Sequence, residues 1–222
     1  MFRRIAATAA LAVIFAAPAT SNAQSCQSMA GNLIQNCSFE LGVVNNGADY
    51  PNAIVSSWNV TAAPNGGSFE RWTNSFDGFA ARDGNSHLEL QVNGPTNIAQ
   101  SFLTTAGQSY ALGFSAAHRY LSSNGFSQID VYLNNSLLIS TGQMTNTYQW
   151  NDFNTNFVST GNETLEFRSM GNQLSYGDFL DNVSVVANTQ VNTVAPEPSS
   201  FALMGAGFAM VGFIVRRKRN QK

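Results

Sequence analysis

Apolar and polar side chains alternate along the middle of this chain of 222 residues. Leu88, Leu90 and Val92 alternate with polar neighbours, and the same period of two recurs at 110–116 and 129–133. Asn, Asp, Gly and Pro gather between such runs, at 45–47, 64–67, 83–85, 93–95, 124–125 and 161–162. Because strands alternate with period two and these residues form turns, the pattern predicts an all-β domain of two antiparallel sheets with about eight to ten strands.

The N-terminal segment does not follow this alternation. Arg3 and Arg4 precede an apolar stretch over 5–17, and small residues follow it up to Ala23. A short basic region, an apolar stretch of this length and small residues at a cleavage site are typical of a secretory signal peptide. The pattern therefore predicts a signal peptide over 1–23 and an exported domain over 24–192.

The last segment, 193–222, has three parts. It contains the tripeptide Pro196, Glu197 and Pro198, which the prolines hold in an extended conformation. Residues 199–215 follow without a charged side chain, and at about 1.5 Å per residue they form a helix of roughly 25 Å, near the minimum for crossing a bilayer.

A basic cluster ends the apolar stretch and consists of Arg216, Arg217, Lys218 and Arg219. Basic residues stay on the cytoplasmic side of a membrane, so we expect the C-terminus inside and the preceding domain outside. A buried core helix is the alternative for 199–215, but such a helix would not end in four cations. The prediction is a single C-terminal transmembrane helix, which anchors the chain in the inner membrane.

The exported domain is strongly acidic. It holds four arginines, no lysine and twelve of the thirteen acidic residues, which gives a formal charge of −8. Phosphate binding depends on clustered Lys and Arg, so nucleic acid is excluded as a partner. Divalent cations or neutral polymers fit better, and the alternative is that the acidity only keeps an exported domain soluble.

The two cysteines of the chain, Cys26 and Cys37, lie close together after the predicted cleavage site. In an oxidising compartment two such cysteines are expected to form one disulfide that closes a small loop. Neither has a neighbouring His or basic residue that would lower the pKa of its thiol, so we expect a structural and not a catalytic role.

Several segments of the domain resemble the galactose-binding-like jelly rolls, a group that contains many carbohydrate-binding modules. Residues 32–40 resemble the first strand of that group, 98–114 a central pair of strands, and 179–185 the closing strand. The resemblance implies a jelly-roll sandwich with an interior Trp58. At the position where the group usually has a glycine this chain has Cys37, so the disulfide is expected to replace a glycine's backbone freedom there.

This resemblance also implies a structural calcium ion. Many members hold calcium between the Glu of the first strand and the Asp of the last strand, which correspond to Glu40 and Asp181 here. Calcium needs six to eight oxygen ligands, which two carboxylates, carbonyl groups and water can supply. The alternative is that both side chains only cap strands or bind backbone amides.

The C-terminal segment resembles the PEP-CTERM sorting signal of Gram-negative bacteria, in the Pro196-Glu197-Pro198 tripeptide, the apolar stretch and the basic cluster. The resemblance implies an exosortase-type membrane protease as a partner. It also implies passage from the inner membrane to the cell surface or the extracellular matrix.

Ligand candidates are aromatic residues that stand beside charged ones. Trp72 follows Arg71, and Tyr120 follows Arg119, in segments interpreted as loops. A sugar ring can stack on such an aromatic side chain while charged groups bind its hydroxyls. Each of these residues could instead belong to the core or its rim.

Motifs for catalysis are not found, and we expect no enzyme activity. The two histidines, His87 and His118, lie in strand-like runs outside any known catalytic pattern. Three functions remain: a noncatalytic surface module that binds polysaccharide, a structural matrix protein of a biofilm without a specific glycan ligand, and, less favoured, a glycoside hydrolase.

Overall fold

The computed structural model describes residues 24–44, 55–63, 68–119, 126–172 and 176–188. These ranges contain ten strands and a short 3-10 helix η1 (Cys26–Ser28). The strands are β1 (Asn59–Ala62), β2 (Ser68–Thr73), β3 (Ser86–Val92), β4 (Asn97–Leu103), β5 (Ser109–His118), β6 (Ile129–Leu133), β7 (Ser136–Ser140), β8 (Asn151–Val158), β9 (Asn162–Ser169) and β10 (Asp178–Ala187). The predicted all-β class and strand number are confirmed.

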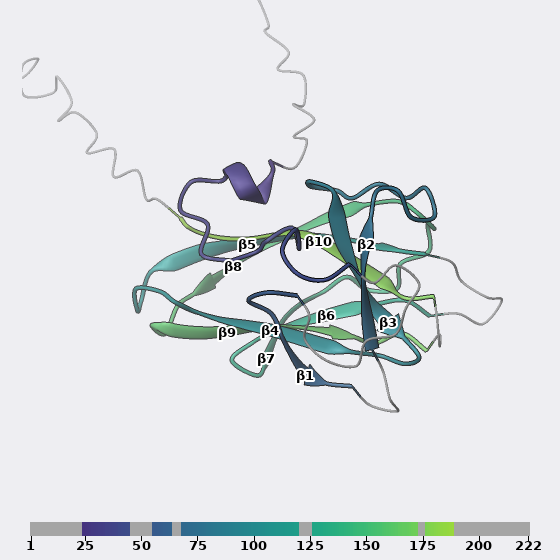
Figure 1. Ribbon diagram of the computed structural model, residues 1–222. Helices are drawn as coiled ribbons and strands as arrows, with labels where there is room; N and C mark the ends of the chain where they lie inside the picture. The colour runs from purple at the N-terminus through teal and green to yellow at the C-terminus, as the bar shows by residue number, and fades with distance from the viewer. Residues whose placement is uncertain (1–23, 45–54, 64–67, 120–125, 173–175, 189–222) are drawn as a thin grey trace, which may run out of the picture. The chain divides into compact units, whose positions relative to one another are not determined.

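The strands form two five-stranded antiparallel sheets (Figure 1). The first sheet has the order β1-β4-β9-β6-β7, and the second has the order β2-β3-β10-β5-β8. Each sheet therefore combines strands that are distant in the sequence, such as β4 with β9 and β3 with β10.

The main hydrophobic core combines residues from both sheets. Leu88 and Leu112 of the second sheet and Phe167 of the first are fully buried in it. Trp58 joins this core, with its ring 5.3 Å from that of Phe39 and 6.0 Å from that of Phe167. The interior position implied for Trp58 is therefore confirmed.

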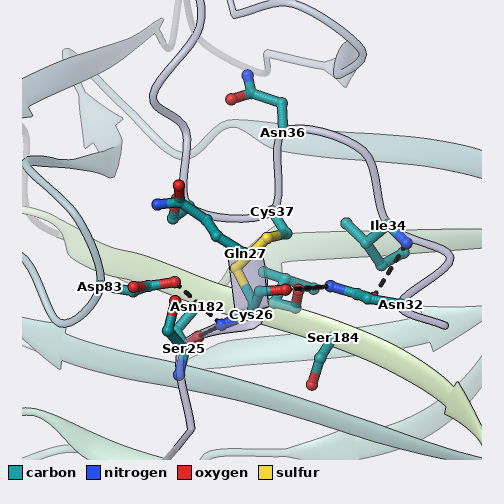
Figure 2. The surroundings of a disulfide bond; sticks show 12 residues. Ser25, Cys26, Gln27, Asn32, Ile34, Asn36, Cys37, Asp83, Asn182 and Ser184 are labelled. Atoms are coloured by element: carbon teal, nitrogen blue, oxygen red, sulfur yellow. Dashed lines mark hydrogen bonds between the residues drawn. A yellow bond between two sulfur atoms is a disulfide. The ribbon is translucent and has the colours of Figure 1, made fainter. Parts of the chain in front are cut away.

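The segment that contains both cysteines lies along β10. The predicted disulfide between Cys26 and Cys37 is present, and both residues are buried (Figure 2). The backbone N–H of Val183 donates to the carbonyl of Cys37 at 2.9 Å, and that of Leu33 donates to Val185 at 2.9 Å. The loop closed by the disulfide is thus fixed to the closing strand of the second sheet.

The residues with positive φ in this loop are not at the position that the family pattern indicates. The residues with positive φ are Asn36 (49°) and Phe39 (57°), and Cys37 has an ordinary backbone conformation. Position 37 therefore does not need a glycine's backbone freedom, and the idea that the disulfide replaces that freedom in holding the loop stays a prediction. Asn36 holds the turn, because its side-chain amide nitrogen donates to the carbonyl of Leu41 and its side-chain oxygen accepts from the N–H of Leu41.

Strand β3 of the second sheet is buried on both of its faces, whereas β8 at the edge of that sheet is partly exposed. All seven residues of β3 are buried, including the polar side chains of His87, Glu89 and Gln91. Leu88 and Leu90 face the main core, so the alternating polar residues face the other side of the sheet. Loops cover that side, and the candidate functional site is found there.

The predicted signal peptide, sorting tripeptide, transmembrane stretch 199–215 and basic cluster lie outside the described residues. Within the described ranges, no helix has the length and apolar character needed to cross a membrane. By its internal contacts the chain divides into a unit ending at Ala187 and a second unit that starts at Asn188.

Candidate functional site

A layer of aromatic side chains covers the second sheet on the side away from the main core. Trp72 of β2 and Phe179 of β10 pack edge to face with ring centroids 5.0 Å apart. Phe79 stacks on Phe179 at 5.3 Å and on Trp150 at 5.1 Å. Phe76 closes the layer against Trp72 at 4.4 Å. This aromatic layer is a hydrophobic cluster separate from the main core.

Arg119 lies on this layer between two aromatic rings. Its guanidinium carbon is 4.5 Å from the ring centroid of Trp72 and 5.5 Å from that of Tyr176. A cation at these distances is attracted by the negative face of each ring. The guanidinium is thereby held in one orientation after the end of β5.

Acidic residues lie on two sides of this guanidinium. Its Nη2 is 3.4 Å from Oδ2 of Asp77, and its Nη1 is 3.8 Å from Oε2 of Glu89. The phenol of Tyr148 donates to the same oxygen of Asp77 at 2.8 Å. We call these six residues the Arg119 cluster: Arg119, Trp72, Tyr176, Tyr148, Asp77 and Glu89.

The Arg119 cluster has a buried base and an open top. Trp72 and Glu89 are 0% exposed, whereas Tyr148 is 40% and Tyr176 44% exposed. The side chain of Asp77 is also 42% exposed. A ligand can therefore reach two tyrosines, the guanidinium edge and one carboxylate.

Burial makes Glu89 an unusual acid. It raises the pKa of Glu89 to about 8, although a hydrogen bond from the backbone N–H of Gly177 at 2.7 Å and the charge of Arg119 act in the opposite direction. The second carboxyl oxygen of Glu89 has no hydrogen-bond partner among the described residues. Glu89 is therefore largely protonated at neutral pH.

His87 lies beneath the aromatic layer. Its ring is edge to face with those of Phe179 (4.9 Å) and Phe79 (5.5 Å). Burial lowers the pKa of His87 to about 3, so the ring is neutral. A fully covered neutral imidazole packs as an aromatic group and is not placed to exchange protons with a ligand.

The structure does not bring all of the predicted ligand residues into one site. Arg119 lies at the centre of the site, and Tyr120 lies outside the described residues. The loop assignment of Trp72 is wrong, because Trp72 lies in β2 and is fully covered. Its ring supports Arg119 from below and cannot itself serve as an exposed platform.

Arg71 points away from the Arg119 cluster. Its guanidinium donates to the backbone carbonyls of Phe39, Glu40 and Gly42 and to the hydroxyl of Ser86. Burial lowers its pKa, while the charge of Glu40 acts in the opposite direction. The contacts of Arg71 are those of a residue that holds the 39–42 segment against β2 and β3, and the structure does not bring it to the candidate ligand site.

Glu40 and Asp181 both bind the backbone of the 82–86 segment. Oε1 of Glu40 accepts from the N–H groups of Asn85 (2.7 Å) and Ser86 (2.8 Å). Oδ2 of Asp181 accepts from those of Arg82 (2.7 Å) and Asp83 (2.9 Å). Their contacts match the role of binding backbone amides.

These contacts do not resemble a calcium shell. The atoms that surround both carboxylates are N–H donors, whereas calcium requires oxygen ligands. Gly84, with φ of +70°, also lies so near that a Cβ there would be 2.4 Å from Oε1 of Glu40. Among the described residues, no group of three or more His, Cys, Asp or Glu side chains could hold a metal ion. Calcium at Glu40 and Asp181 stays a prediction.

Four residues of the Arg119 cluster are not among the ligand candidates named from the sequence, namely Asp77, Glu89, Tyr148 and Tyr176. Glu89 was seen only as the polar member of an alternating strand. Asp77 and Tyr148 come from loops separated by 71 positions, and they meet through one hydrogen bond. Period-two patterns identify strands but carry no information on which loops meet above a sheet.

The geometry favours binding over catalysis. Glycoside hydrolysis needs two carboxyl groups that both reach the scissile bond. Asp77 is accessible, but Glu89 is fully covered, where it accepts from the backbone N–H of Gly177 and lies beside Arg119. The accessible groups can stack on a ligand and form hydrogen bonds with it.

The sequence of the chain matches two known family models. A family model described as "Protein of unknown function (DUF642)" matches residues 32–186. The chain belongs to the DUF642 family. A second model, the PEP-CTERM protein-sorting motif, matches residues 194–219, so the predicted sorting motif of this DUF642 protein is confirmed. A search of the curated proteins found no match.

Several solved structures are similar to this DUF642 protein. The carbohydrate-binding module TmCBM61, solved in complex with β-1,4-galactotriose, is 15% identical with a TM-score of 0.50, over 70% of this chain and 98% of that one. A family 16 carbohydrate-binding module is 17% identical (TM-score 0.46; 70% and 99%). The K1 cleaved adhesin domain of Lys-gingipain from Porphyromonas gingivalis W83 is 15% identical (TM-score 0.49; 68% and 96%). The likeness to TmCBM61 confirms the predicted jelly-roll class, and at 15% identity it concerns the fold alone.

Proposed function

We propose that this DUF642 protein is exported, sorted by an exosortase-type protease, and binds carbohydrate noncatalytically at the Arg119 cluster. The PEP-CTERM motif supports export and sorting. The structural likeness to TmCBM61, whose structure holds a galactotriose, supports a carbohydrate as the ligand class. In this proposal residues 1–23 are the signal peptide, 24–192 the binding domain, and 193–222 the sorting segment.

The observation that carries the binding proposal is the position of Arg119 between Trp72 and Tyr176. Sugars offer an apolar ring face and several hydroxyls that both donate and accept. The exposed tyrosine rings can stack on the apolar ring face, while the fixed guanidinium and the Asp77 carboxylate can form hydrogen bonds with the hydroxyls. Because the buried base holds these groups in place before a ligand arrives, binding costs little ordering of side chains.

A glycan array with the full-length protein tests this proposal. We expect binding to at least one polysaccharide, and its loss in Arg119→Ala and Tyr176→Ala. Tyr132→Ala is the matched control, because the Tyr132 ring also carries a guanidinium, that of Arg168 at 3.7 Å, but lies in the first sheet. Equal binding by all four proteins would refute the Arg119 cluster as the site. If no glycan binds and the protein still stays in the biofilm fraction, a structural matrix role replaces this proposal.

Processing is tested separately by mapping the mature termini with mass spectrometry of cell and culture fractions. We expect an N-terminus after Ala23 and a C-terminus near 196–198. Replacing Glu197 with Ala should leave the uncut chain in the inner membrane. An intact chain in the cytosol would contradict both export and sorting.

A further inference from the structure

A recess of about 340 Å³ lies between residues 141–146 and the start of β8. This volume is near the lower end of the roughly 300–1,000 Å³ typical of ligand pockets. The recess is distinct from the Arg119 cluster, with which it shares no lining residue. Its polar lining includes Gln143, Asn146, Asn151 and Asp152.

Asp152 is held rigidly at this recess. Its Oδ1 accepts from Nε of Arg82 at 3.2 Å and from the hydroxyl of Ser115 at 2.7 Å, and its Oδ2 accepts from Nη2 of Arg82 at 2.9 Å. This two-point contact with Arg82 lowers the pKa of Asp152, so the carboxylate is charged and accepts hydrogen bonds only. Its side chain is nevertheless 33% exposed, so free lone pairs remain for a ligand.

Three carboxamides line the recess together with this carboxylate. Gln143 and Asn146 are exposed, and among the described residues their side chains have no hydrogen-bond partner. Asn151 donates one N–H to the carbonyl of Gln149 at 3.1 Å and retains its side-chain oxygen. A carboxamide offers two N–H donors and one accepting oxygen, which suits a ligand whose hydroxyls both donate and accept.

The inner side of the recess is apolar. It is formed by Met144, which is 5% exposed, and by Phe153, which is half-buried. Phe153 stacks on Phe114 of the core with ring centroids 5.2 Å apart, so its ring is fixed. A fixed apolar side with amides and a carboxylate around it matches one sugar ring and its hydroxyls.

We propose that this recess is a second carbohydrate site, which binds one neutral sugar unit. The inference rests on the proposed carbohydrate-binding function, but uses other residues. A neutral unit is specified because Asp152 would repel the carboxylate of a uronic acid, and Arg82 is already engaged with Asp152. Trp150 of the aromatic layer directly precedes Asn151, so the aromatic layer and the recess are joined by adjacent residues of the chain.

The test uses the side-chain amide signals of the full-length protein in NMR, in a detergent without a sugar headgroup. Neutral methyl glycosides and the corresponding uronic acids are the probes. We expect the amide signals of Gln143, Asn146 and Asn151 to shift with at least one neutral glycoside and not with its uronic acid. Loss of one amide hydrogen bond in Gln143→Ala or Asn151→Ala should raise Kd by about three- to tenfold.

Asn154→Ala is the matched control, because Asn154 is an exposed carboxamide of the same strand that does not line the recess. Its Kd should equal that of the wild type. If glycans bind, Arg119→Ala abolishes binding, and the recess amides do not shift, the second site is refuted while the proposed function stands. If no glycan perturbs the protein at either place, both are refuted.

Discussion

Removing the disulfide is expected to destabilise the domain without changing its fold. The perturbation is the double replacement Cys26→Ala and Cys37→Ala. The bond joins residues 11 positions apart, and the loop-entropy relation gives about 3 kcal/mol for a loop of this length. For a domain of this size a loss of about 3 kcal/mol lowers Tm by about 6–12 °C.

Noncovalent contacts limit how far the effect spreads. The backbone N–H of Cys26 donates to Oδ1 of Asn182 at 2.7 Å and to Oδ2 of Asp83 at 3.0 Å (Figure 2). These hydrogen bonds do not require the sulfur atoms, so the segment should keep its place on β10 in the folded protein. The loss should appear as a lower Tm with an unchanged circular dichroism spectrum at 20 °C.

Thermal unfolding followed by circular dichroism, with and without a reducing agent, measures this prediction. Reduction should lower the Tm of the wild type and leave that of the double variant unchanged, which separates the bond from the side-chain replacements. A reduced wild type with a Tm within about 2 °C of the oxidised protein would refute the reasoning, because it would imply an effect below about 1 kcal/mol.

Three further predictions concern other buried groups. Trp72→Ala should lower the unfolding free energy by about 3–5 kcal/mol in urea titrations, because Trp72 is fully buried; a change below about 1 kcal/mol would show that the ring is not enclosed. Because burial raises the pKa of Glu89 from 4.5 to about 8, the folded protein keeps a proton that the unfolded chain releases, so stability should fall as pH rises from about 4.5 to 8. Glu89→Gln should flatten this slope, and an unchanged slope would assign it to other groups. If calcium binds at Glu40 and Asp181, Tm should rise with CaCl₂ and fall with EDTA, and a constant Tm would contradict it.

The strands could be predicted from the sequence because one of their faces meets a core. Leu88 and Leu90 alternate with polar residues, and the structure places both in the main core. The disulfide was also predictable, since the chain has two cysteines and an export signal. Both predictions depend only on local spacing or on simple counts.

The covering of the second sheet could not be predicted in the same way. The alternation of polar residues in β3 indicates a side of the strand that faces solvent, yet Glu89 and Gln91 are 0% exposed. Their burial results from loops that fold back over the sheet, such as the one that brings Gly177 to Glu89. Those loop contacts join residues 88 positions apart, and no periodic pattern records them.

In this domain, which has no lysine, several carboxyl groups are partnered by backbone N–H groups. Gly177 donates to Glu89, Asn85 and Ser86 donate to Glu40, and the 82–83 backbone donates to Asp181. Each of these three carboxyl groups thus contacts the backbone of a loop. The loops at 82–86 and near 177 carry Arg82 and Tyr176, which belong to the two proposed sites. Acidic side chains therefore fix the loops that carry groups which would contact a neutral polysaccharide.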